Sequence, residues 1–123
     1  MPATAQQNSI KILYGESDES ALSSQAAEMK KAGHHVTTAH NRQAVQQALH
    51  GDAFDLVILG ATLSKDDRHH LPYMVKKARP GTKVLVMHAG THHHEVDAAI
   101  DPSMSMNRIL EKIAALLHPA AVS

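Results

Sequence analysis

One short apolar run, from Phe54 to Gly60, constrains the fold of this chain more than any other stretch. It lacks the in-and-out alternation of a strand that has one face in water. The run therefore predicts a strand buried on both faces of a sheet. In an open parallel sheet, ligands bind beyond the carboxyl ends of the strands, so the identity of residue 60 matters for function.

Further strands and helices are predicted on either side of this run. Apolar or β-branched residues predict four more strands, over Ile10–Gly15, His35–Ala39, Lys83–Met87 and Val96–Ile100. Capping residues before apolar residues at helical spacing predict helices that begin near Asp18, Asn41 and Ser105. A polar loop is predicted over residues 60–70, and Pro72 suits the first turn of the helix that follows it. Strands that alternate with helices indicate one α/β domain with a parallel sheet.

The connection between the last two predicted strands is unusually short. Only His88 to Glu95 separates them, whereas a parallel crossover with its helix needs about 10–12 residues. We therefore predict that the fourth crossover helix is shortened or missing. The alternative is a helix over Thr91 to Ile100 without a fifth strand, and we favour the strand.

Composition excludes several classes of protein. The length of 123 residues suits one domain, predicted over residues 10–117 between tails at 1–9 and 118–123. There is no cysteine, no apolar stretch long enough to cross a bilayer and no signal-peptide pattern. Lys+Arg and Asp+Glu both number 12, so no basic excess indicates nucleic-acid binding. We expect a cytoplasmic protein that binds neither nucleic acid nor membrane.

Four segments resemble a known family. They are Lys11–Asp18, where a strand runs into acidic residues, Ala32–Ala39 (AGHHVTTA), Phe54–Leu59, and Ile109–Ile113 in the last helix. With these segments, residues 10–117 resemble a response regulator receiver domain of the CheY-like superfamily. The resemblance implies a flavodoxin-like three-layer sandwich with a five-stranded parallel sheet in the order 2-1-3-4-5.

The resemblance also implies a chemistry, from which this chain departs at the acceptor. The family transfers a phosphoryl group, with Mg²⁺, to an aspartate at the end of the third strand. That position is Gly60, which has no side chain to phosphorylate. The family's acidic pair after the first strand becomes Glu16 and Ser17, with Asp18 beside them, so the set of carboxylates that suits Mg²⁺ is reduced.

Other family positions differ as well. The Thr or Ser after the fourth strand corresponds to His88, and the family's Lys corresponds to Asp101 or, in another alignment, to Pro102. Neither residue can place an ammonium group on a phosphoryl oxygen. We therefore expect no catalytic residue, no metal and no cofactor, and a degenerate phosphorylation pocket formed by Glu16, Ser17, Asp18, Gly60, His88 and Asp101.

These features also have structural interpretations. Glu16, Ser17 and Asp18 form either a remnant metal site or, as we favour, a helix cap beside the helix dipole. His88 is either a proton-sensitive switch among carboxylates or, as we favour, a partly buried side chain hydrogen-bonded to a neighbour.

The histidines of the short connection offer a separate site. His92, His93 and His94 form either a transition-metal site or, as we favour, a solvated loop. The eleven histidines of the chain also allow the hypothesis of a metal or pH sensor.

We predict a non-phosphorylatable pseudo-receiver, not an enzyme, that acts as a protein-interaction module in a two-component-type pathway. A protein partner, or a second copy in a homodimer, would bind the face of the fifth strand and the last helix. The alternative is a residual Mg²⁺-dependent phosphoacceptor that uses a displaced carboxylate, Asp66, Asp67 or Glu16.

Overall fold

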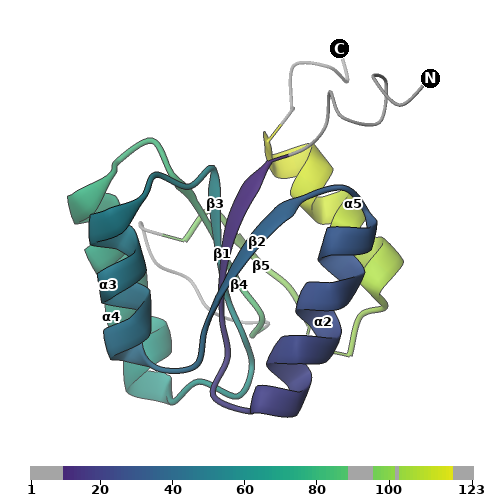
Figure 1. The fold of residues 1–123 in the computed structure, drawn as a ribbon, viewed down its shortest axis with the longest axis horizontal. Helices are drawn as coiled ribbons and strands as arrows, with labels where there is room; N and C mark the ends of the chain where they lie inside the picture. Colours follow the sequence, from purple (N-terminus) through teal and green to yellow (C-terminus); the bar gives the residue numbers. More distant parts are fainter. Residues whose placement is uncertain (1–9, 89–95, 102, 118–123) are drawn as a thin grey trace.

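The computed structural model describes residues 10–88, 96–101 and 103–117 (Figure 1). Its strands are β1 (Lys11–Gly15), β2 (His35–Ala39), β3 (Leu56–Leu59), β4 (Lys83–Val86) and β5 (Ala98–Ala99). Its helices are α2 (Glu19–Lys31), α3 (Arg42–Gly51), α4 (Lys65–Ala78) and α5 (Met106–Leu117). Every strand pair is parallel and the sheet order is β2-β1-β3-β4-β5, which confirms the predicted flavodoxin-like architecture.

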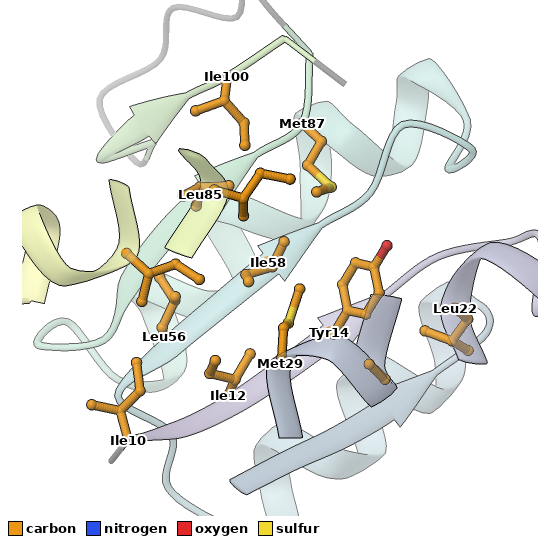
Figure 2. Close-up of a cluster of buried hydrophobic side chains, with 13 residues drawn as sticks. Ile10, Ile12, Tyr14, Leu22, Met29, Leu56, Ile58, Leu85, Met87 and Ile100 are labelled. Carbon is orange, nitrogen blue, oxygen red and sulfur yellow. The ribbon is translucent and has the colours of Figure 1, made fainter. Parts of the chain in front are cut away.

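The sheet is the middle of three layers, and β1 and β3 are buried on both of its faces. Helices α2 and α5 cover one face, and α3 and α4 cover the other (Figure 1). Along β3, Leu56 and Ile58 face the first layer, while Val57 and Leu59 face the second, and all four are fully buried. Figure 2 shows the first cluster, in which Ile58 lies among side chains of β1, β4 and α2. The prediction from the central apolar run is confirmed.

Most helix ends follow the predicted signals. The side chains of Asp18, Asn41 and Ser105 accept hydrogen bonds from backbone amides in the first turns of α2, α3 and α5. Gly33 follows α2 with a φ of 102°, a left-handed conformation that favours glycine at a helix end. Among the helices of the described ranges, none has the length and apolar character needed to cross a membrane.

The predicted start of α4 was wrong. The helix begins at Lys65, and its N-cap is Ser64, whose hydroxyl accepts a hydrogen bond from the Asp67 amide at 3.1 Å. Two acidic residues in the first turn favour this start through the helix dipole. Pro72 lies buried inside the helix, where its missing amide proton removes one backbone hydrogen bond. Asp66 and Asp67 therefore belong to the first turn of α4, not to a loop.

Strand β5 is short and pairs with the end of β4. Ala98 pairs with Leu85 and Ala99 with Val86, so the strand prediction is confirmed over these residues. The described residues between β4 and β5 contain no helix, and residues 89–95 lie outside the described part. A shortened or missing fourth crossover helix fits this arrangement.

His34 links the end of α2 to the start of β1. Its half-buried imidazole accepts a hydrogen bond at Nδ1 from the Ile10 amide, at 3.3 Å. Burial, and then the charge of His35, lowers the pKa of His34 below its ordinary value of 6.5. Because a protonated Nδ1 cannot accept a hydrogen bond, the folded state favours the neutral form of the His34 imidazole.

We expect the free energy of unfolding to fall as the pH drops below 6.5, because His34 takes up protons at a higher pH in the unfolded chain. His34→Gln, whose amide oxygen can accept the same hydrogen bond, should remove up to about 1 kcal/mol of this fall. Urea unfolding at about pH 7.5 and about pH 5.5 measures the effect. His40→Gln removes an exposed imidazole, and an equal loss in that variant would contradict the assignment to His34.

Candidate functional site

Glu16 and Gly60 follow adjacent strands and meet at the carboxyl edge of the sheet. The Gly60 amide donates a hydrogen bond to the Gly15 carbonyl at 2.7 Å, which holds the ends of β1 and β3 together. The Glu16 amide donates to the Ala39 carbonyl at 3.0 Å, at the end of β2. The peptide group between Gly15 and Glu16 is therefore held by hydrogen bonds at both its carbonyl and its amide.

The Glu16 side chain folds over Gly60 instead of pointing into water. Glu16 is only 1% exposed, which is rare for a carboxylate. A Cβ added to Gly60 would lie 2.0 Å from Glu16 Oε1, 2.1 Å from Cδ and 2.2 Å from Oε2, distances that real contacts do not show. The carboxylate thus occupies the space into which a side chain at residue 60 would project.

Three hydrogen bonds hold the Glu16 carboxylate. Thr62 donates its amide and its hydroxyl to Oε2, at 2.7 and 2.6 Å, and the Tyr14 hydroxyl donates to Oε1 through a short bond. The Thr62 hydroxyl accepts from the Asp18 amide at 3.0 Å, so its own proton is directed to Glu16. We call Tyr14, Glu16, Gly60 and Thr62 the Glu16 site.

Tyr14 is the deepest member of the Glu16 site. Its ring is fully buried in the first core cluster, beside Met29 and Ile58 (Figure 2). Burial, together with the hydrogen bond and the charge of Glu16, raises the pKa of Tyr14 well above its ordinary value of 10.0. The phenol is therefore a permanent donor to Glu16 at neutral pH.

The loop between β3 and α4 is held from both sides. Thr62 contacts Glu16 and Asp18, while Arg68 donates to the Ala61 and Leu63 carbonyls at 3.2 and 2.7 Å. This leaves the loop little freedom to change conformation without breaking charge-assisted hydrogen bonds.

The side chains of the other residues predicted for the pocket do not contact the Glu16 carboxylate. Ser17 is exposed, and Asp18 caps α2 by accepting from the Ser20 and Ala21 amides. The capping interpretation therefore describes Asp18 but not Glu16, whose carboxylate makes no cap.

His88 and Asp101 are both exposed. The expectation of a partly buried His88 was wrong, because this residue follows the end of β4 on the surface. Asp101 accepts from the Ser103 amide and hydroxyl at 2.9 and 2.8 Å, and these bonds lower the pKa of Asp101. Its carboxylate thus stabilises a local turn.

Of the two candidate carboxylates on α4, Asp66 and Asp67, the second is already paired. Its Oδ1 lies 2.7 Å from Arg42 Nε in a half-buried ion pair between α3 and α4. Asp66 is exposed beside it. Both lie in the first turn of α4, where the helix dipole already favours a negative charge.

The residues present do not fit a Mg²⁺ ion, which the receiver resemblance implies. Mg²⁺ needs free oxygen ligands in near-octahedral geometry, but both Glu16 oxygens already accept hydrogen bonds. Residue 60 offers no carboxylate, and Asp18 Oδ1 is used by the α2 cap. In the part of the chain that the structure describes, no group of three His, Asp or Glu side chains could hold a metal. His92, His93 and His94 lie outside the described residues.

The sequence interpretation missed Tyr14 and Thr62 as members of the site. Tyr14 had a usable signal, since it is a hydroxyl-bearing residue in a strand predicted to be buried, and a buried Tyr hydroxyl needs a partner. Thr62 lies in a loop without a distinctive motif, so only the fold reveals its role.

Solved structures show what this architecture is similar to. A response regulator receiver domain protein (CheY-like) from Methanospirillum hungatei JF-1 has a TM-score of 0.78 at 21% identity, over 89% of this chain and 94% of that chain. A two-component response regulator from Clostridium difficile has a TM-score of 0.77 at 16% identity, over 89% and 97%. The response regulator TrrA from Thermotoga maritima, in complex with Mg²⁺-BeF, has a TM-score of 0.75 at 18% identity, over 87% of this chain and 98% of that chain. The chain has the receiver fold.

This likeness is one of fold. No family model matches the sequence, and no curated protein matches it. In this chain, the Glu16 site lies at the carboxyl edge of the sheet, and the Glu16 side chain fills the space over Gly60.

Proposed function

We propose that this receiver-fold domain is a pseudo-receiver that signals without being phosphorylated. The observation that carries the proposal is the Glu16 carboxylate over Gly60, in the space that an acceptor side chain would need. The solved structures of similar fold are response regulators, which supports a role in a two-component-type pathway. The proposed domain spans residues 10–117, acts in the cytoplasm, and has no catalytic residue and no cofactor.

Output in this proposal comes from binding a protein partner. The proposed surface is the face of β5 and α5, which follows the short connection from β4 in the sequence. Arg108 and Glu111 are exposed on α5 and available to such a partner, or to a second copy in a homodimer. Neither membrane nor nucleic acid is part of the proposal.

Intact mass spectrometry after incubation with acetyl phosphate and Mg²⁺ tests the proposal. We expect no phosphoryl adduct, because residue 60 has no acceptor oxygen and both Glu16 oxygens are engaged. A stoichiometric adduct would overturn the proposal. Peptide mapping of such an adduct to Asp66, Asp67 or Glu16 would instead support a displaced acceptor.

A further inference from the structure

We infer that the Glu16 carboxylate is an internal ligand in a carboxylate-binding site built by Thr62 and Tyr14. When the Glu16 side chain is cut back, this site should bind a small carboxylate from solution. The inference rests on the proposed function in one respect, because both require that Glu16 fills the space over Gly60. It concerns how the site recognises a carboxylate, and it does not depend on a protein partner.

The three donors of this site come from two parts of the chain and point at one place. The Thr62 amide belongs to the backbone of a loop held by Arg68, and the Thr62 hydroxyl is oriented by the Asp18 amide. The Tyr14 hydroxyl is carried by a fully buried side chain on β1. Donors held in place by other contacts do not need to be reordered when a ligand binds.

The donor set selects a carboxylate. Glu16 Oε2 accepts two hydrogen bonds from Thr62, and Oε1 accepts one from Tyr14. A planar group with two acceptor oxygens matches this pattern. Gly60 contributes the room, because any Cβ at residue 60 would collide with the bound group.

Glu16→Ala removes the part of the side chain that acetate can replace, a carbon bonded to a carboxylate. We expect Glu16→Ala to unfold at a lower temperature than the wild type. For a dissociation constant of about 10 mM, about 0.1 M sodium acetate should raise its midpoint by about 3–5 °C beyond sodium chloride at equal ionic strength. Wild type should show no such extra shift, because Glu16 already fills the site.

Glu16→Ala/Thr62→Val is the matched control, since it keeps the cavity but loses one of the three donors. We expect acetate to raise the unfolding midpoint of this variant by at most about half as much as that of Glu16→Ala. The reason is that each hydrogen bond to the charged carboxylate contributes to its binding, and one is lost. An equal acetate shift in wild type, Glu16→Ala and the double variant would overturn the inference.

Glu16→Gln provides an independent test if Glu16→Ala does not fold. It keeps the shape of the side chain but replaces one acceptor oxygen with a donor. We expect a midpoint about 4 °C below wild type, because charge-assisted hydrogen bonds are lost. Wild-type stability of Glu16→Gln would overturn the inference. A phosphoryl adduct on the wild type, by contrast, would overturn only the proposed function.

Discussion

Gly60→Asp is expected to destabilise the domain by about 3 kcal/mol or more, without creating a phosphoryl acceptor. The new Cβ would lie 2.0 Å from Glu16 Oε1, so the buried carboxylate must leave its three donors. The new carboxylate would also place a second negative charge beside Glu16 in a buried setting, which is unfavourable. Urea unfolding measures the stability, and intact mass after acetyl phosphate measures the acceptor activity.

Two further variants separate the causes of this effect. Gly60→Ala adds the collision without the charge, and we expect a smaller loss of about 1–3 kcal/mol. Glu16→Ala/Gly60→Asp removes the collision, so the double variant should be more stable than the sum of the two single losses predicts. Strict additivity, or a Gly60→Asp variant as stable as the wild type, would show that residues 16 and 60 do not compete for one space.

Tyr14→Phe is expected to lower the free energy of unfolding by about 2 kcal/mol. The change leaves the ring in the core but removes the donor to Glu16 Oε1, and a buried carboxylate oxygen then lacks its hydrogen bond. Tyr73→Phe deletes the same atom from the other tyrosine of the chain, which is 50% exposed on α4, and should change stability by less than about 0.5 kcal/mol. Equal effects in the two variants would contradict the role given to Tyr14.

The raised pKa of Tyr14 adds a dependence on alkaline pH to the same experiment. The folded chain keeps the phenol protonated, whereas the unfolded phenol ionises near its ordinary pKa of 10.0. The contribution of the Tyr14 phenol to the free energy of unfolding is therefore complete below pH 10 and declines as the pH rises above 10. In Tyr14→Phe this part of the decline should be absent, which urea unfolding at about pH 8 and about pH 10.5 can measure.

Local patterns were enough to predict the sheet and most helix ends. The run from Phe54 to Gly60 has the apolar continuity of a strand covered on both faces, and Asp18 and Asn41 have the side chains that cap helices. The start of α4 was mispredicted because Pro72 suits a first helical turn, whereas Ser64, followed by Asp66 and Asp67, is the actual N-cap.

The Glu16 site was only half predictable. The strand order places Glu16 beside Gly60, as the resemblance to receiver domains implied. Whether Glu16 points outward or folds over Gly60 depends on donors that are close only in three dimensions, namely Tyr14 and Thr62. Side-chain direction of this kind has no periodicity in the sequence, so no local pattern reports it.

The reciprocal fit of Glu16 and Gly60 also bears on how such a sequence can change over generations. While Glu16 is folded over Gly60, any side chain at residue 60 would lie 2.0–2.2 Å from its carboxylate, so a substitution there must displace Glu16 from its donors. An acid at position 60 can be accepted only if the side chain at position 16 is shorter or turns away from this space. Geometry thus couples the residue allowed at position 60 to the direction of the side chain at position 16.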